Sequence, residues 1–155
     1  MSARAARSLC VKDIMGRNPV RVGQATTVGE LAEILEGNDI SGVPVVDAQE
    51  RLVGVVSRTD LIRRCVEGPP GTQPGSFFSA LAEGLGGGTD LDPEELGVVE
   101  DFMSLDPVTA EPDEPVGLVA LRMAEEQVHR AIVVDEQRRV IGVVTALDLL
   151  KVFPT

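Results

Sequence analysis

Apolar residues recur at helical spacing near the start of the chain. One stripe falls at positions i, i+3, i+4 and i+7 and consists of Val28, Leu31, Ala32 and Leu35. This spacing predicts an amphipathic helix that buries one face. Thr27 and Glu30 form a capping box at the start of this helix, and Gly37 and Asn38 supply its end.

β-Branched residues then gather in two short runs, 43–46 and 52–56, with the polar segment 47–51 between them. This pattern predicts a β-hairpin. A short extended piece is expected at 19–22, and a further helix is expected to begin near Arg58. The unit therefore reads strand, helix, strand, strand, helix.

The same unit occurs a second time without gaps. The segment starting at Val11 (VKDIM) returns at Val99 (VEDFM), so the offset is 99 − 11 = 88 residues. In the second unit, Pro115 occupies the expected first helical position, and the runs 132–134 and 140–144 supply the hairpin. The second apolar stripe consists of Val116, Val119, Ala120 and Met123.

The repeat determines the fold class. A unit of about fifty residues buries too little surface to be stable alone. We therefore expect an α/β fold in which two tandem β-α-β-β-α repeats pack sheet against sheet about a pseudo-twofold axis. The expected boundaries are an N-terminal arm at 1–10, a first repeat at 11–67, an insertion at 68–97 and a second repeat at 98–155.

The insertion is rich in glycine and proline and is too long for an ordinary connection. Its apolar residues are spaced for one short helical face: Phe77, Phe78, Leu81 and Leu85. The segment 92–95 (DPEE) is typical of a helix start. Two interpretations remain open: a mobile linker, or a segment whose phenylalanines dock on the module or on a partner.

Composition narrows the class of protein. The 155 residues, 43% of them hydrophobic, suffice for one compact core, and the apolar runs are too short to span a bilayer. The formal net charge of −11 repels nucleic-acid phosphates, so direct nucleic-acid binding is not expected. Cys10 and Cys65 form no C-x-x-C motif and indicate reduced thiols and a cytoplasmic location.

Short motifs in both repeats resemble those of a known family. The first repeat carries D-I-M followed by P-V, then V-P-V-V-D, then G-V-V-S-x-x-D, and the second repeat carries the matching series. Over 11–64 and 99–153, the series resembles tandem cystathionine-beta-synthase (CBS) domains of the stand-alone bacterial type. This resemblance implies a regulatory sensor that binds an adenosine ligand in the cleft between its repeats. AMP, ADP, ATP, an NAD-type molecule and S-adenosylmethionine are the expected ligand class.

The resemblance assigns the ribose contact to the motif that closes each repeat. The matching residues are Ser57 and Asp60 in the first repeat, and Thr145 and Asp148 in the second. A carboxylate accepts hydrogen bonds from both ribose hydroxyls, and the hydroxyl ahead of it marks a helix start that favours phosphate. The same residues are also ordinary capping boxes, which would stabilise the helices by roughly 1 kcal/mol without any ligand.

By the same resemblance, the residues that face the phosphate of the ligand lie just ahead of the second strand of each repeat. His129 and Arg130 stand there in the second repeat, and the planar Arg130 guanidinium suits phosphate oxygens. Ser41 and Gly42 replace them in the first repeat. That half therefore lacks a cation at the matching position and is expected to hold a nucleoside, a different ligand or nothing.

The edge of the adenine ring is expected to contact the backbone near Val20 and Val108. Neighbouring valines would form the apolar walls that a purine ring prefers. Simpler interpretations remain open for these residues. His129 and Arg130 also fit an ordinary surface, and both valines also fit a hydrophobic core.

The sequence contains no catalytic constellation. It has one histidine, no cysteine–histidine pair at ligand spacing and no Walker-type loop. We therefore expect a non-enzymatic protein without a required cofactor or metal, for which the nucleotide is a regulatory ligand. It would act on an unidentified effector protein, without nucleic acid or membrane, and its apolar helix stripes favour a homodimer. The alternative is a ligand-independent dimerisation or docking module with vestigial nucleotide clefts.

Overall fold

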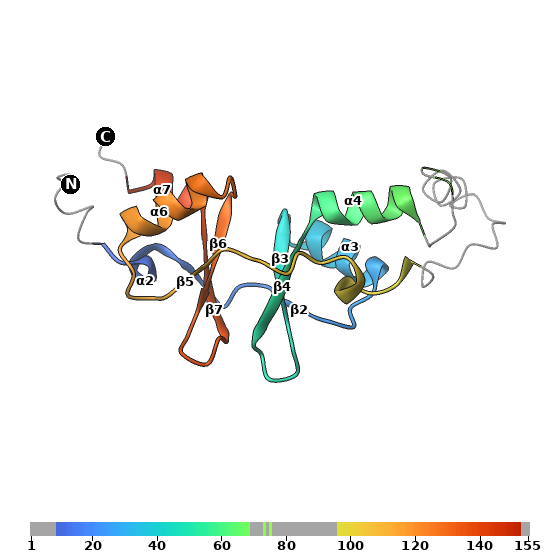
Figure 1. The fold of residues 1–155 in the computed structure, drawn as a ribbon, viewed down its shortest axis with the longest axis horizontal. Helices are drawn as coiled ribbons and strands as arrows, with labels where there is room; N and C mark the ends of the chain where they lie inside the picture. The colour runs from blue at the N-terminus through green and yellow to red at the C-terminus, as the bar shows by residue number, and fades with distance from the viewer. Residues whose placement is uncertain (1–8, 69–72, 74, 76–95, 153–155) are drawn as a thin grey trace. The chain divides into compact units, whose positions relative to one another are not determined.

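The computed structural model describes residues 9–68, 73, 75 and 96–152 (Figure 1). The expectations for 1–8, for the apolar residues at 77–85 and for 92–95 lie outside these residues. The chain divides into two compact units. Unit 1 contains Met1–Val20, Val46–Val53 and Asp106–Thr155, and unit 2 contains Arg21–Val45 and Gly54–Leu105.

Unit 1 is built on a four-stranded mixed sheet with the order β1-β7-β6-β5. Strand β7 pairs antiparallel with both β1 and β6, and β5 pairs parallel with β6. The elements of unit 1 are α2 (Val11–Ile14), β1 (Gly16–Arg17), β5 (Thr109–Ala110), α6 (Val116–Glu125), β6 (Arg130–Val134), β7 (Val140–Thr145) and α7 (Ala146–Leu150).

Unit 2 is built on a three-stranded sheet with the order β2-β3-β4. The first strand is β2 (Val22–Gly23). The helices of unit 2 are α3 (Val28–Gly37), α4 (Arg58–Glu67) and the 3₁₀ helix η2 (Val99–Asp101). Strands β3 (Gly42–Val46) and β4 (Leu52–Ser57) run from unit 2 into unit 1, which contains their connecting loop. Within the described residues, no helix has the length and apolar character needed to cross a bilayer.

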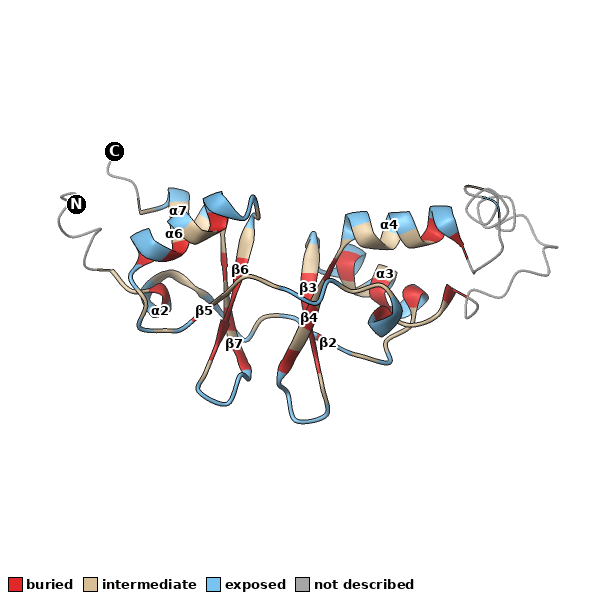
Figure 2. Cartoon of the chain, viewed as in Figure 1, coloured by how far each residue is buried: buried red, intermediate tan, exposed pale blue. Residues whose placement is uncertain are grey.

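The predicted apolar stripes are core residues (Figure 2). The buried members are Val28, Leu31 and Leu35 on α3 and Val116, Val119 and Met123 on α6. The expectation that these stripes drive self-association is therefore wrong, because their side chains are already packed within the units.

Element boundaries follow the predicted signals with two differences. Thr27 caps α3 and accepts a hydrogen bond from the Glu30 N–H at 3.1 Å, as the capping box predicts. Pro115 is the residue before α6 instead of its first helical residue, because its ψ of 137° is extended. The extended piece predicted at 19–22 is replaced by β1 and β2, with Pro19 and Val20 between them.

The two hairpin loops share the pattern D-x-Q-x-R and the same hydrogen bonds. Asp47 accepts bonds from the N–H groups two and four residues later, at 2.8 and 3.0 Å, and Asp135 does so at 2.9 Å for both. These bonds lower the pKa of both carboxyls. The largest cause is the backbone N–H of Arg51 for Asp47 and that of Arg139 for Asp135. Within unit 1, the Leu52 N–H donates to the Arg138 carbonyl at 2.9 Å and joins the loops.

Each repeat begins with an opening motif (VKDIM from Val11, VEDFM from Val99) and ends with a closing motif (G-V-V-[S/T]-x-x-D). The opening motif of each repeat packs in one unit with the closing motif of the other repeat. Strand β1 pairs with β7, and the Ser104 N–H donates to the Val55 carbonyl at 2.8 Å. A Cβ added at Gly54 would lie 2.7 Å from the Ser104 carbonyl oxygen, and one at Gly142 would lie 2.5 Å from the Met15 Sδ. At Gly54 the contact is with backbone, so a larger residue would displace the segment, whereas at Gly142 it is mainly with the Met15 side chain. Each compact unit combines parts of both sequence repeats.

Gly54→Ala is expected to destabilise the protein, because the added methyl group would meet a backbone oxygen that cannot move independently. Overpacking of this kind costs roughly 1–3 kcal/mol, so the urea unfolding midpoint should fall. Gly29→Ala is the matched control, since nothing lies within 4 Å of its added Cβ. Alanine is favoured over glycine within helices by about 1 kcal/mol, so this control should keep or gain stability. Equal midpoints for the two variants would contradict close packing at Gly54.

Candidate functional site

The closing motifs of both repeats form the same compact structure where a strand passes into a helix. In unit 2, Asp60 Oδ2 accepts hydrogen bonds from the N–H and the hydroxyl of Ser57, both at 2.9 Å. In unit 1, Asp148 Oδ2 accepts the Thr145 N–H at 2.9 Å, and the Thr145 hydroxyl accepts the Asp148 N–H at 3.2 Å. These residues are therefore genuine capping boxes, as the simpler interpretation predicts.

The capping role uses one oxygen of each carboxylate. The second oxygen, Oδ1, lies 3.7 Å from Arg63 Nη1 in Asp60 and 3.8 Å from Lys151 Nζ in Asp148. These are loose ion pairs, and the aspartate side chains retain 23% and 20% of their exposure. A carboxylate held in this way can cap its helix and still accept hydrogen bonds from a ligand at Oδ1.

Unit 1 brings the predicted phosphate-side residues next to this motif. Strand β6 begins at Arg130, which is the register partner of Thr145 on β7. The carbonyl of His129, an exposed residue, accepts the Ala146 N–H at 2.9 Å. Arg130 is half-buried, and desolvation lowers the pKa of its guanidinium. Placing an anion beside a partly desolvated guanidinium is electrostatically favourable.

Unit 2 contains the corresponding residues of the first repeat. The Ser41 carbonyl accepts the Arg58 N–H at 2.8 Å, which ties the residue before β3 to the start of α4. Gly42 begins β3 and offers no side chain. The Arg58 side chain turns back toward β3, where its Nε donates to the Ile40 carbonyl at 3.1 Å. The sequence analysis gave Arg58 only as a helix start, because the 88-residue offset aligns it with Ala146 and so gives no signal for a role of its side chain.

The two predicted adenine-side valines differ in their surroundings. Val108 is partly buried, packs against the core of unit 1, and its carbonyl accepts the Ile132 N–H at 2.9 Å. Val20 is 38% exposed and belongs to unit 1, whereas Ser57 and Asp60 belong to unit 2. The structure thus places Val108 in the same unit as Asp148, but it does not place Val20 in the same unit as Asp60.

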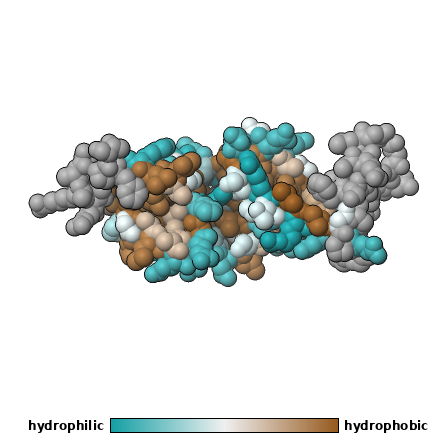
Figure 3. Space-filling model, turned by 90° about the horizontal axis from the view of Figure 1, so that it is seen from above, coloured by the Kyte–Doolittle hydropathy of each residue, from teal (hydrophilic) through white to brown (hydrophobic). Residues whose placement is uncertain are grey.

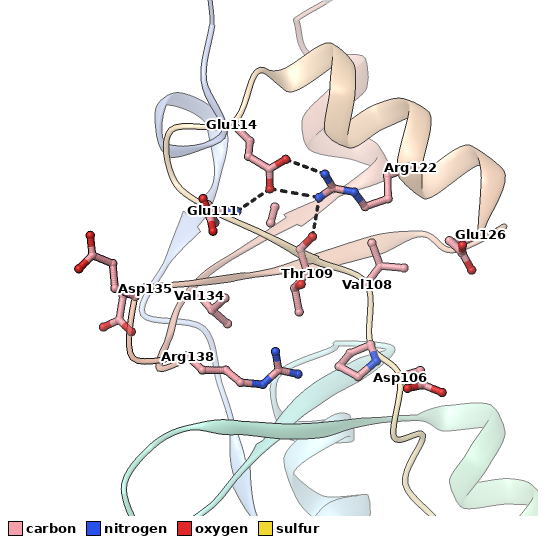
Figure 4. Close-up of a pocket in the computed structure, with 13 residues that line it drawn as sticks. Asp106, Val108, Thr109, Glu111, Glu114, Arg122, Glu126, Val134, Asp135 and Arg138 are labelled. Atoms are coloured by element: carbon pink, nitrogen blue, oxygen red, sulfur yellow. Dashed lines mark hydrogen bonds and ion pairs between the residues drawn. The ribbon is translucent and has the colours of Figure 1, made fainter.

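A cavity of about 660 Å³ lies in unit 1 beside β5 and α6 (Figure 4). Of the predicted site residues described here, only Val108 lines it. Its lining is otherwise mostly charged, and comprises Asp106, Pro107, Thr109, Ala110, Glu111, Glu114, Arg122, Glu126, Val134, Asp135, Glu136 and Arg138. The volume is within the range of small-molecule sites, but six carboxylates against two guanidiniums make it a poor place for a phosphate.

The strongest interaction along this cavity is the ion pair between Glu114 and Arg122. Arg122 Nη2 lies 2.6 Å from Glu114 Oε2, and Arg122 Nη1 donates to the Thr109 carbonyl at 2.7 Å (Figure 4). The Glu111 N–H also donates to Glu114 Oε1 at 2.9 Å. The hydrogen bond from Arg122 is the main cause that holds the pKa of Glu114 below its ordinary value of 4.5. The ion pair ties α6 to the segment between β5 and α6, and the hydrogen bond to the Thr109 carbonyl ties α6 to β5.

Residues 11–67 and 99–155 each match the CBS domain family. The chain therefore belongs to this family, and the matched segments form a CBS domain pair. CBS pairs are regulatory modules and are generally not catalytic.

Among curated relatives, the chain is 29% identical over 143 residues to an L-aspartate semialdehyde sulfurtransferase from Methanocaldococcus jannaschii. That match covers 92% of this chain and 23% of the relative. The chain spans about a quarter of the length of the first curated relatives that it matches.

Solved CBS pairs share the fold. The CBS domain pair of protein MJ0100, solved in complex with 5′-methylthioadenosine and S-adenosyl-L-methionine, is 29% identical with a TM-score of 0.69. This match covers 94% of this chain and 95% of that one. The protein CBSX2 in complex with AMP is 26% identical with a TM-score of 0.69, over 92% of this chain and 93% of that one; CBSX2 is from Arabidopsis thaliana.

Glu114→Gln is expected to reduce stability at neutral pH, because the partly exposed pair with Arg122 loses its charge. The loss should be about 1 kcal/mol after allowing for solvent screening. A carboxyl with a lowered folded-state pKa stabilises above its unfolded value of 4.5, and this contribution disappears as pH falls through the folded value. Urea unfolding of both proteins should therefore show a difference at pH 7 that shrinks below pH 4.5.

Glu126→Gln is the control for this experiment, because Glu126 is an exposed residue that lines the same cavity. It should change stability little at either pH. A stability difference for Glu114→Gln that persists undiminished in acid would show that its charge is not the cause.

Proposed function

We propose that this chain is a regulatory module that binds adenosine nucleotides such as AMP, ADP or ATP, with NAD-type molecules and S-adenosylmethionine in the same class. The nucleotide would act as a regulatory ligand and not as a cofactor. The observation that carries the proposal is the pair of closing-motif aspartates, each with one oxygen used for capping and one left with only a loose ion pair within the described residues. The adenosine ligands in the two solved CBS pairs support the same class.

In unit 1 the proposed ligand would contact three groups. Asp148 Oδ1 would accept hydrogen bonds from the ribose hydroxyls, and Arg130 would bind the phosphate with its partly desolvated guanidinium. Val108 would provide an apolar wall for the adenine. Asp60 and Ser57 would hold the ribose in unit 2, with Ser41 and Gly42 on the phosphate side.

Ligand binding would be transmitted to a partner through α7. Asp148 lies on this helix, which also exposes Leu147 and Leu150 to solvent. A ligand that binds Asp148 and Arg130 would favour one position of α7 relative to β6, and so change the packing of these leucines in a homodimer and the surface that the dimer offers to an effector protein. The free thiols of Cys10 and Cys65 support a cytoplasmic location.

Asp148→Ala is expected to weaken adenosine-ligand binding in unit 1 at least about tenfold, because a charge-assisted contact with the ribose is lost. The measurement is calorimetry, with a thermal-shift panel of AMP, ATP, NADH and S-adenosylmethionine. In Asp60→Ala/Asp148→Ala, none of these ligands should raise the melting temperature.

Asp13→Ala is the matched control, because Asp13 Oδ2 accepts the Cys10 N–H at 2.8 Å and so caps α2 in the same way. This variant loses a cap but no proposed ligand contact, so its ligand response should remain. If no adenosine ligand shifts the melting temperature of the wild-type protein, the module is a ligand-independent docking protein instead.

We further propose that the chain forms a homodimer through the outer faces of α6 and α7. The exposed apolar side chains on these helices are Leu118, Leu121, Leu147 and Leu150. The view onto the helices shows hydrophobic surface in this region (Figure 3). Clustered exposed leucines of this kind are typical of protein interfaces, and closed two-fold symmetry is the commonest arrangement.

The double variant Leu147→Glu/Leu150→Glu is expected to convert a dimer into a monomer, because it places two like charges on the proposed interface. Light scattering coupled to size-exclusion chromatography measures the mass directly. Leu105→Glu is the control, since Leu105 is 68% exposed but lies in unit 2. A wild-type monomer at high concentration would refute the proposed dimer.

A further inference from the structure

The cavity beside α6 has negative charge that its own lining does not neutralise. Six carboxylates and two guanidiniums line it. Glu114 is paired with Arg122, and Asp135 accepts its hydrogen bonds within its own hairpin loop. The other four carboxylates are exposed and have no hydrogen bond or ion pair with any described residue: Asp106, Glu111, Glu126 and Glu136. The cavity therefore attracts a cationic occupant.

These carboxylates are spread along the cavity and do not converge on one point. Glu111 and Glu114 lie at the turn that leads into α6, and Glu126 lies at the other end of the helix (Figure 4). Ten residues separate Val116 from Glu126, which is about 15 Å along an α-helix. Among the described residues, no group of acidic, histidine or cysteine side chains could hold a metal ion. The arrangement favours an extended segment of chain with two separated positive charges.

The chain itself has such a segment next to the cavity. Residues 1–8, here called the basic segment, contain Arg4 and Arg7 and no acidic residue. The basic segment leads directly into Leu9, whose carbonyl accepts the Val116 N–H at 3.0 Å. It is therefore attached to unit 1 beside the start of α6, at the Glu114 end of the cavity.

The reach of the basic segment matches the length of the cavity. An extended chain advances at most about 3.5 Å per residue, so Arg7 can lie about 7 Å from Leu9 and Arg4 about 17 Å. The first distance suits the Glu111 end, and the second suits the Glu126 end. Ion pairs between exposed groups are individually weak. A short tether nevertheless gives an effective concentration in the millimolar range, which favours docking within one chain.

We propose that the cavity beside α6 binds the basic segment of the same chain, with Arg7 at Glu111 and Arg4 at Glu126. The contact is autoinhibitory, because a basic segment of another protein could enter the cavity only by displacing these arginines. This inference goes beyond the proposed nucleotide binding and does not depend on it, since neither Asp148 nor Arg130 lines the cavity.

The test is limited digestion of the full chain with trypsin, which cleaves after arginine where the chain is accessible. A docked basic segment should resist cleavage at about 0.01 M salt, where charges interact over about 30 Å. It should be cleaved rapidly at about 1 M salt, where this range falls to about 3 Å. Mass spectrometry follows the loss of the basic segment. A free peptide with the sequence of residues 1–10, digested in parallel, corrects for the effect of salt on trypsin.

The cavity variant is Glu111→Gln/Glu126→Gln/Glu136→Gln, which removes three exposed carboxylates and keeps the size of their side chains. At low salt, cleavage after Arg4 and Arg7 should become about tenfold faster than in the wild-type protein. Such a change corresponds to a basic segment that is docked about 90% of the time, because cleavage follows the population of the open form.

The matched control is Glu33→Gln/Glu36→Gln/Glu67→Gln, which removes the same charge from three exposed glutamates of unit 2. This variant should be cleaved at the rate of the wild-type protein. Thermal unfolding verifies that both triple variants remain folded.

Equal cleavage rates for the wild-type protein and the cavity variant at low salt would overturn the proposal, and the cavity would then be open to a cationic segment of another protein. Protection that persists at 1 M salt would also overturn it, because charge would not be the cause. Faster cleavage of the unit 2 control would show that the overall charge of the chain, and not the cavity, holds the basic segment. Protection seen only at high protein concentration would place the segment in a second copy. Nucleotide binding is measured separately, so none of these results bears on the proposed function.

Discussion

The packing of a chain segment directly against Gly54 and Gly142 is the constraint on which the rest of the structure depends. An added Cβ would lie 2.7 Å from the Ser104 carbonyl oxygen at Gly54, and 2.5 Å from the Met15 Sδ and 3.0 Å from the Gly16 carbonyl oxygen at Gly142. The segment at Gly54 includes Ser104, and the segment at Gly142 includes Met15. These contacts join the opening of one repeat to the closing motif of the other, because they add β1 to the sheet of unit 1 and bridge Val55 and Ser104 in unit 2. Val11 and Val99, in the same opening segments, are fully buried. The glycine in G-V-V therefore has a steric role, independent of any ligand.

A few residues later, the same closing motif has a structural role and also carries the proposed ribose contact. Asp60 and Asp148 each use one oxygen to cap a helix, which fixes the carboxylate in position before a ligand arrives. Preorganisation of this kind reduces the entropy lost on binding. The capping role and the proposed ribose contact of these residues thus do not compete, because a different oxygen would serve each of them.

The sequence predicts the local structure well because periodicity and caps are local signals. The helix after Thr27, the two hairpins and the helix start at Arg58 all follow from spacing within about ten residues. The exchange of the opening motifs could not be predicted in this way, because nothing near Met15 or Met103 encodes which glycine it will contact. The amphipathic pattern also could not distinguish a core stripe from an interface, since both need an apolar face.

The candidate site was predictable in its residue types but not in its completeness. The closing aspartates and Arg130 follow from the resemblance to CBS domains, and Arg130 does begin β6 opposite Thr145. The position of the Arg58 side chain was not predictable, because the repeat offset pairs this residue with Ala146, whereas its guanidinium reaches the residues ahead of β3 from α4. The cavity beside α6 was missed for a related reason, since it is formed by residues brought together only by folding.

The chain passes from one compact unit to the other at four places, after Val20, Val45, Val53 and Leu105. Neither unit is a continuous stretch of sequence, so a cut at the repeat boundary would separate β1 from the sheet of unit 1 and the segment 99–105 from the rest of unit 2. Such interlacing raises the average sequence separation of contacting residues, which slows folding. It also means that unit 1 cannot be completed until the segment after Leu105 is synthesised, although its first strand comes from the start of the chain. Because each unit contains parts of both repeats, the pair would be inherited and shuffled between proteins as a single piece.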